Sequence, residues 1–458
     1  SNKINKFIDL LPFKLTGSQN VVIKEILNDL TSQSVMNRLL QGDVGSGKTV
    51  VALIAALAMV FDGYQAAFMA PTEILAQQHY ATLSRLFSFG HIIERQETHI
   101  VLSLPGFNKT ITMGILIGSM KQSSKKMIVE KLNKKEINIV VGTHALIQDD
   151  VNIPNMGLAV VDEQHRFGVE QRATLRNKGN NPHMLVMSAT PIPRSLNLTV
   201  YGDLDISILN ELPVGRKEIK TVFINDEDRT KAYEFTRQQV EKGRQAFVLC
   251  PLIEESEILQ TKAATEEYEK LVADIYPEFN VGLLHGRMKL SEKDKVMIEF
   301  QNHDIDILVC TPVIEVGIDI PNASVMIIDG ADRFGLAQLH QIRGRVGRGE
   351  FQSYCVLIAD APSENAQIRL KLLEGSNDGF ELAEEDLNLR GPGDYLGTRQ
   401  SGLPNFKVAQ ISDFEILYQA RQTALKVLSV DPKLEDKDNL DLNKSVKKFE
   451  EKLYSEIN

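Results

Sequence analysis

A glycine-rich stretch near the N-terminus has the residue types and spacing of a phosphate-binding loop. Residues 42–49 read Gly-Asp-Val-Gly-Ser-Gly-Lys-Thr, which fits the pattern G-x-x-x-x-G-K-[ST]. Glycines let backbone N–H groups turn toward phosphate, here at the start of the helix predicted over residues 50–60. Lys48 is expected to reach the β- and γ-phosphates, and the Thr49 hydroxyl to bind Mg²⁺. The glycines of this predicted nucleotide site are Gly42, Gly45 and Gly47.

Two adjacent carboxylates form the second candidate group. Asp162 and Glu163 directly follow the apolar run at residues 158–161. Carboxylates at the exposed end of a buried strand are costly unless they serve a cation or a proton. We therefore expect Asp162 to belong to the Mg²⁺ shell and Glu163 to orient and deprotonate an attacking water.

A third group is cationic. Residues 341–348 read Gln-Ile-Arg-Gly-Arg-Val-Gly-Arg, a high density of guanidinium groups. Arginines that reach across a cleft to phosphates held by another lobe accelerate hydrolysis by roughly a thousand-fold or more. A phosphate cradle on one lobe with arginines on the next indicates a nucleotide clamped between lobes, as in a motor.

The elements that must position these groups follow an α/β order. Short, β-branched apolar runs, typical of parallel strands buried on both faces, alternate with amphipathic helices such as those expected over residues 73–87 and 291–300. The predicted strands are 66–70, 115–118, 137–141, 158–161, 184–187, 221–224, 246–249, 281–284, 307–310 and 325–328. This alternation predicts doubly wound parallel sheets. The series breaks at the linker-like residues 212–216, so we expect two lobes of similar size.

Composition limits the class of protein. The 458 residues include 51 basic and 61 acidic ones, so the formal net charge is −10. This charge argues against a protein that binds nucleic acid by charge alone, but it permits a local basic groove. No apolar run approaches the ~20 residues of a membrane span. Cys250, Cys310 and Cys355 lie far apart in apolar runs. They therefore predict buried thiols in a reducing compartment rather than disulfides or a cysteine zinc site.

In combination, these motifs resemble helicase superfamily two and, within it, the RecG family of branched-DNA helicases, from Phe13 to about Gln410. The first-lobe matches are an adenine-reading segment with Phe13 and Gln19, the phosphate loop, Pro71-Thr72-Glu73, Gly142-Thr143-His144, residues 162–165 and Ser188-Ala189-Thr190. The second-lobe matches are His285-Gly286-Arg287, Thr311, residues 315–319 with Gly317 and Asp319, and residues 341–348. The resemblance makes Arg345 and Arg348 the arginine fingers.

Beyond the second lobe, the chain resembles the translocation motif shared by RecG and transcription-repair coupling translocases. Two short helices, expected over residues 368–373 and 380–389, precede a loop rich in glycine and proline that contains Leu389-Arg390-Gly391-Pro392-Gly393-Asp394. The resemblance implies that Arg369, Arg390 and Gln400 couple ATP hydrolysis to DNA movement. The coupling translocases usually read Asp-Glu-Glu-Gln where this chain reads Asp-Glu-Gln-His at residues 162–165, which favours RecG.

The implied architecture is two RecA-like lobes in tandem, at residues 1–211 and 212–360, a helical hairpin and loop at 361–410, and a helical segment at 411–458. RecG proteins also carry an N-terminal wedge domain, whereas this chain begins just before the adenine-reading segment. Either the chain is truncated or the protein is a RecG-like motor without branch specificity. Ser1-Asn2, which reads as an expression scar, favours truncation.

The implied function is an ATP-dependent double-stranded DNA translocase that remodels stalled forks and Holliday junctions, with ATP and Mg²⁺ as cofactors. DNA contacts at the ends of parallel strands should be mostly to phosphate, through Thr72, Ser119, Thr143, Arg287 and Thr311. Ser188 and Thr190 should link hydrolysis to these contacts. The resemblance further implies a bacterial, cytoplasmic, nucleoid-associated monomer that meets single-stranded-DNA-binding protein. The alternatives are a transcription-repair coupling motor and a nucleotide-gated DNA-binding module without turnover.

Overall fold

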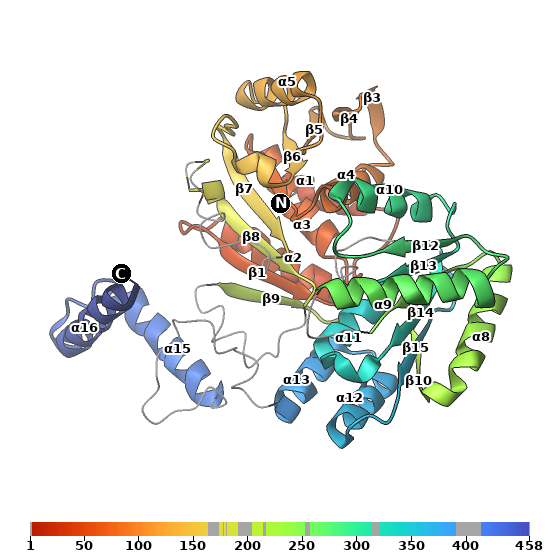
Figure 1. Cartoon of the computed structure of the whole chain (residues 1–458). Coiled ribbons are helices and arrows are strands. Elements are labelled where there is room, and N and C mark those ends of the chain that lie inside the picture. Colours follow the sequence, from red (N-terminus) through yellow and green to blue (C-terminus); the bar gives the residue numbers. More distant parts are fainter. Residues whose placement is uncertain are drawn as a thin grey trace. The chain divides into compact units, whose positions relative to one another are not determined.

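The computed structural model describes residues 2–163, 174–176, 178–179, 181–190, 204–213, 217–251, 257–312, 320–390 and 414–457 (Figure 1). The chain divides into two compact units. The larger unit comprises residues 1–191 and 204–382, and the smaller comprises 192–203 and 383–458. The larger unit contains two β-sheets, and we call the parts built on them the first and the second lobe.

The first lobe is a nine-stranded sheet in the order β3-β4-β5-β6-β2-β7-β8-β1-β9. Its strands, in that order, are His91–Arg95, His99–Ser103, Thr110–Leu116, Ile139–Gly142, Gln65–Met69, Met156–Asp162, His183–Ser188, Asn37–Gly42 and Asp205–Leu209. All pairs from β5 to β9 are parallel. The central strands are almost wholly buried because helices cover both faces.

One edge of this sheet departs from the sequence-based expectation. The pairs β3–β4 and β4–β5 are antiparallel, so the prediction of a purely parallel sheet is wrong there. Residues of β3 are all exposed, and the strand therefore lacks the continuous apolar signature by which the parallel strands were predicted. The doubly wound α/β class itself is confirmed.

The first lobe includes the α-helices α1 (Asn2–Asp9), α2 (Gly17–Leu30), α3 (Lys48–Phe61), α4 (Glu73–Leu86) and α5 (Gln122–Asn133). Helix α3 follows the glycine-rich loop, and ten of its fourteen residues are buried, as expected for a helix that packs within a core rather than on a surface. This buried helix gives the loop a rigid base.

The second lobe is a six-stranded parallel sheet in the order β10-β15-β14-β11-β13-β12. Its strands, in that order, are Lys220–Asn225, Tyr354–Ala359, Ala323–Asp329, Gln245–Leu249, Ile307–Cys310 and Val281–Leu284. The helices are α8 (Arg229–Glu241), α9 (Glu257–Lys270), α10 (Leu290–Gln301) and α11 (Leu336–Arg343), followed by α12 (Glu364–Gly375) and α13 (Gly379–Arg390). Two apolar clusters fill its core, and the three cysteines are buried thiols, as predicted.

The smaller unit contains α15 (Phe414–Val430) and α16 (Leu440–Ile457). Between them, the Asp431 carboxylate accepts hydrogen bonds from the backbone N–H groups of Glu435 and Asp436 and from the Asn439 amide, and these bonds hold the turn. Within the described ranges, no helix combines the length and apolar character needed to cross a membrane.

Candidate functional site

The glycine-rich loop joins β1 to α3, the strand–loop–helix context that the motif requires. Gly45 and Gly47 have φ angles of +79° and +87°, a region that glycine adopts readily and other residues rarely do. A Cβ at Gly47 would also collide with the Gln19 amide. The Lys48 Nζ donates to the carbonyls of Gly42 at 2.7 Å and Asp43 at 2.9 Å. The lysine is therefore held inside the loop by two of its backbone carbonyls.

Gln19 supports the loop from helix α2. Its side chain completes a capping box with Thr16, since Oε1 accepts from the Thr16 N–H at 3.0 Å. Its Nε2 donates to the Ser46 carbonyl at 2.8 Å. The same residue thus fixes the start of α2 and one carbonyl of the phosphate loop, while Phe13, 45% exposed, lines the same cavity.

The two carboxylates lie at the carboxyl end of β7. Asp162 Oδ1 accepts from the Glu163 N–H at 3.0 Å, and Oδ2 lies 2.6 Å from Nε2 of His79 on α4. Burial raises the pKa of Asp162, but the neighbouring His79 and Lys48 outweigh it and hold that pKa below its usual value. Glu163 has a φ angle of +52°. A non-glycine residue in this region is strained, and such strain is concentrated at functional sites.

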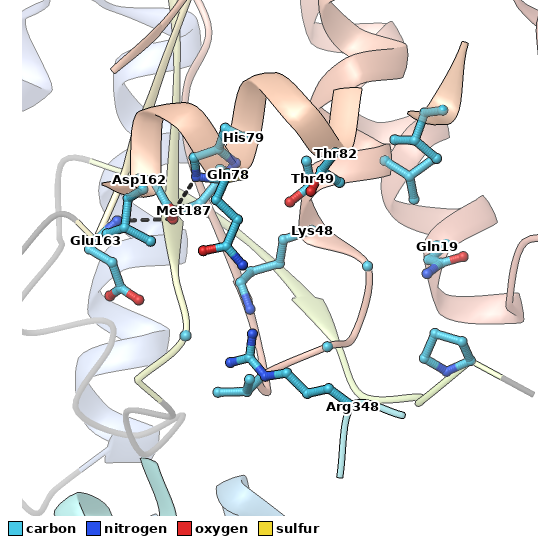
Figure 2. A pocket seen from close by; sticks show the side chains of 18 of the residues that line it. Gln19, Lys48, Thr49, Gln78, His79, Thr82, Asp162, Glu163, Met187 and Arg348 are labelled. Carbon is cyan, nitrogen blue, oxygen red and sulfur yellow. Dashed lines mark hydrogen bonds and ion pairs between the residues drawn. The ribbon is translucent and has the colours of Figure 1, made fainter. Parts of the chain in front are cut away.

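These groups line one cavity of about 650 Å³, together with side chains from the second lobe (Figure 2). Lys48, Thr49, Asp162 and Glu163 come from the first lobe, and Arg345 and Arg348 from the segment after α11. Burial lowers the pKa of Lys48, Arg348 lowers it further, and Asp162, Glu163 and Asp43 oppose the shift. The cavity thus brings together a phosphate loop, two carboxylates and three cationic side chains. Each of these three groups was expected from the sequence.

The cavity carries oxygen donors of the kind that bind Mg²⁺. Thr49 offers a hydroxyl and Asp162 a carboxylate to the same cavity, and oxygen ligands are what Mg²⁺ prefers. Over the residues that the structure describes, no cluster of three or more His, Cys, Asp or Glu side chains could cage a metal ion. Mg²⁺ commonly binds through one or two protein oxygens plus substrate phosphates, so this sparse donor set fits the ion.

The arginine-rich segment divides into two kinds of residue. Arg343 is 2% exposed and donates to the carbonyls of Leu373 at 2.7 Å and Ser376 at 2.8 Å, and to Thr221 at 3.3 Å. It therefore ties α11 to β10 and to the end of α12. Arg345 and Arg348 line the cavity instead.

Hydrogen bonds join the lobes next to this cavity. The Gln341 amide donates to Thr190 Oγ1 at 2.8 Å. His340 Nε2 lies 2.8 Å from Oδ1 of Asp43 in the phosphate loop, and its Nδ1 accepts from Arg343 at 2.8 Å. Because the guanidinium can only donate, Nδ1 carries no hydrogen and Nε2–H donates to Asp43.

The residues expected to contact DNA, or to link hydrolysis to those contacts, lie at or beyond the carboxyl ends of strands. In order, they are Thr72 after β2, Ser119 after β5, Thr143 after β6, Ser188 and Thr190 at and after β8, Arg287 after β12, and Thr311 after β13. Burial separates them: Ser119 and Arg287 are exposed, whereas Thr143, Ser188 and Thr311 are buried. Thr72 caps α4 and Thr143 caps the 3₁₀ turn η1 (His144–Ile147).

Some predicted residues cannot be placed. Gly317, Asp319 and Gln400 lie outside the described residues, as does the side chain of Arg390. Arg369, on α12, donates to the Asp332 carbonyl at 2.9 Å.

The structure also adds residues to the site that the sequence analysis did not identify. Gln78, His79 and Thr82 of α4 line the cavity, and His340 contacts the phosphate loop. Neither histidine belongs to a recognised motif, and each reaches its carboxylate across a long sequence separation, 83 residues for His79 and 297 for His340. No local pattern could have found them.

Family models match most of the chain. The DEAD/DEAH box helicase model matches residues 16–199, the helicase conserved C-terminal domain matches 229–350, and the model "ATP-dependent DNA helicase RecG, domain 3, C-terminal" matches 376–455. The third match covers α13 and the helices of the smaller unit.

Curated relatives are similar over nearly the whole chain. The ATP-dependent DNA helicase RecG of Synechocystis sp. is 50% identical over 99% of this chain and 52% of its own length. The protein of the same name from Bacillus subtilis is 48% identical over 94% of this chain and 61% of its own length. The chain thus spans about half to three-fifths of the length of these relatives.

Solved structures give the same assignment. A structure of RecG bound to a three-way DNA junction matches with a TM-score of 0.74 and 47% identity, over 91% of this chain and 52% of that one. Dbp5 of S. cerevisiae, bound to RNA and ADP BeF3, matches with a TM-score of 0.56 at 17% identity, over 85% and 97% of the two chains, and supports the fold alone. From the cavity, the two lobes and these similarities, the chain belongs to the RecG family.

Proposed function

We propose that this chain is the motor of an ATP-dependent helicase that translocates on double-stranded DNA and remodels branched DNA. The observation that carries the proposal is the shared cavity, to which one lobe contributes a phosphate loop and carboxylates and the other contributes arginines. Clamping of a nucleotide between lobes makes lobe movement depend on the state of the γ-phosphate. The related RecG structure, bound to a three-way junction, supports branched DNA as the substrate class.

The residues predicted from the motifs have proposed roles in nucleotide binding and hydrolysis. Lys48 neutralises the β- and γ-phosphates, and the backbone around Gly42, Gly45 and Gly47 cradles them. Glu163 orients a water molecule and takes its proton. Phe13 and Gln19 contact the adenine, and Arg345 and Arg348 stabilise the charge that develops on the transferred phosphoryl group.

The proposed Mg²⁺ ligands are Thr49 and Asp162. Mg²⁺, when bound with ATP, supplies positive charge to the phosphate oxygens. We assign Gly317 and Asp319 to the same nucleotide site on the motif match alone.

DNA is proposed to lie along the strand ends that carry Ser119, Thr72 and Arg287, with its contacts mainly to phosphate. The buried Thr143, Ser188 and Thr311 then act by shaping these strand ends rather than by direct contact. Thr190 links the two lobes through Gln341. Arg369, Arg390 and Gln400 are proposed to transmit lobe movement to the duplex.

The proposed division of the chain is residues 1–211 and 212–360 for the two RecA-like lobes, 361–410 for the translocation hairpin and loop, and 411–458 for the C-terminal helices. The two sheets and the first two family-model matches support the boundary between the lobes. We further propose that the protein acts as a monomer in the bacterial cytoplasm, near the nucleoid and single-stranded-DNA-binding protein.

Phosphate release measured without DNA, with linear duplex and with a three-way junction tests the proposal. We expect DNA to stimulate release, and the wild-type rate to fall to background in Lys48→Ala. A chain that binds ATP but releases no phosphate under any condition would instead be a nucleotide-gated binding module. A chain whose release does not respond to DNA would contradict the assignment as a DNA motor.

A further inference from the structure

His79 holds one of the two carboxylates of the cavity from outside the recognised motifs. Its Nε2 lies 2.6 Å from Asp162 Oδ2, with 12% of the His79 side chain and 15% of the Asp162 side chain exposed. The other oxygen, Oδ1, accepts from the Glu163 N–H at 3.0 Å. Figure 2 shows the histidine reaching Asp162 from its helix, with the contact drawn as a dashed line. The carboxylate is therefore held at both oxygens, which fixes its rotation.

We propose that His79 is a positioning residue for the metal: it holds Asp162 in the orientation in which the carboxylate binds Mg²⁺. The proposal rests on the proposed function, because it assumes that Asp162 is the Mg²⁺-binding carboxylate. In this role His79 acts on the ion through Asp162 rather than as a ligand of its own.

The chemistry of the contact supports positioning rather than competition with the ion. A carboxylate only accepts hydrogen bonds, so Nε2 of His79 carries the hydrogen and donates. Each carboxylate oxygen has two lone pairs, so one hydrogen bond to each oxygen leaves lone pairs available for a cation. Carboxylates that bind metals are characteristically held by such hydrogen bonds, and loss of the partner typically weakens metal binding by about 10- to 100-fold.

The helix that carries His79 is a firm support. Helix α4 begins at the Thr72 cap, where the Thr72 side chain accepts from the Leu75 N–H at 3.3 Å. Leu75, Ala76 and Leu83 are buried in the core of the first lobe. A side chain based on such a helix can define the position of its partner more precisely than one from a loop.

The test is the Mg²⁺ dependence of nucleotide binding, followed by titration of a fluorescent ADP analogue at a series of Mg²⁺ concentrations. In His79→Leu we expect about 10- to 100-fold more Mg²⁺ to be needed for half-maximal binding. His79→Gln should restore most of this loss, because its amide can donate to Asp162 from a similar reach. His79→Asn, which is polar but shorter, should behave like His79→Leu. His91→Leu, at an exposed histidine on β3, is the matched control and should match the wild type.

Three results are distinguishable. A wild-type chain that binds the analogue without regard to Mg²⁺ would contradict the proposed function itself. A Mg²⁺-dependent wild type with unchanged His79→Leu and His79→Asn would overturn the role of His79 alone. Tighter Mg²⁺ binding in these two variants would also overturn it, because His79 would then compete with the ion. Thermal unfolding of each variant checks that the protein is folded. If His79 only packed against its neighbours, Mg²⁺ affinity would not be higher in His79→Gln than in His79→Asn and His79→Leu.

Discussion

The two lobes are built alike but supply different charged groups to the cavity: the first supplies Lys48 and two carboxylates, and the second supplies only arginines among its charged lining residues. In the first lobe, the phosphate loop follows the end of β1, and the carboxylates Asp162 and Glu163 lie at the end of β7. In the second, the segment after α11 supplies Arg345 and Arg348 to the same cavity. A phosphate group carries negative charge that must be surrounded, so neither lobe alone provides a complete site. The similar sheets thus act as scaffolds, and the difference between them lies in a few side chains at their edges.

A second contrast lies within the arginine-rich segment itself. Arg343 and Arg345 are two residues apart and both buried, yet Arg343 bonds the backbone of its own lobe whereas Arg345 lines the cavity. The number of arginines in this segment therefore overstates the positive charge that reaches the cavity. Substitutions that separate catalysis from stability can test this division.

The largest effect is expected at the cavity arginines. Arg345→Ala and Arg348→Ala should each lower the rate of ATP hydrolysis by about 10³- to 10⁵-fold, because they remove charge that stabilises the transition state. The midpoint of thermal unfolding should change little. Single-turnover phosphate release and a melting curve measure both quantities. Hydrolysis at the wild-type rate in either variant would remove that arginine from the proposed catalytic set.

The opposite side of the cavity should show a different pattern. Glu163→Gln should lower hydrolysis by about 10²- to 10⁴-fold, since it removes a general base, while ATP binding is retained. Lys48→Ala should weaken binding itself, because Lys48 is proposed to contact the phosphates in the ground state. Fluorescent-nucleotide titration alongside turnover separates the two outcomes. Near-normal turnover in Glu163→Gln would contradict the assignment of the base.

Arg343→Leu should act mainly on stability. It leaves the carbonyls of Leu373 and Ser376 without their buried donor, and we expect a loss of about 3 kcal/mol in the free energy of unfolding. Chemical denaturation measures this loss, and Arg287→Leu, at an exposed arginine, is the control. A folded and fully stable Arg343→Leu chain that fails to hydrolyse ATP would place Arg343 with the catalytic arginines instead.

The features of the fold and the site that could be predicted from the sequence are those encoded by residues close together in the chain. Most parallel strands of both lobes were predicted because each is a short apolar run buried on both faces, whereas β9 and β15 were not among the predicted strands. The phosphate loop and the pair Asp162–Glu163 were found because their chemistry lies within a few adjacent residues. The structure places these groups in one cavity, in agreement with the prediction that they form a nucleotide site.

The rest depends on contacts between distant residues. The exposed strand β3 carries no pattern of a buried strand, so the antiparallel edge was missed. His79 and His340 belong to the site because each contacts a carboxylate on another element. The sequence around a single histidine does not indicate such a contact. The division between Arg343 and its neighbours likewise follows from which backbone carbonyls lie within reach after folding.

The smallest expected effect concerns the contact between the lobes. The Gln341 amide donates to Thr190 Oγ1 at 2.8 Å, a neutral hydrogen bond, and such bonds typically contribute about 1 kcal/mol. If it helps to hold the lobes together around the nucleotide, Gln341→Ala and Thr190→Val should each reduce kcat/KM for ATP by roughly five-fold. The double variant should be little worse than either single one, because both remove the same bond. Ser119→Ala, at an exposed position on the first lobe, serves as the control and should combine additively with Gln341→Ala. Strictly additive losses for Gln341→Ala and Thr190→Val would show that the two side chains act independently, and the cavity would then depend on charge from the second lobe rather than on this contact.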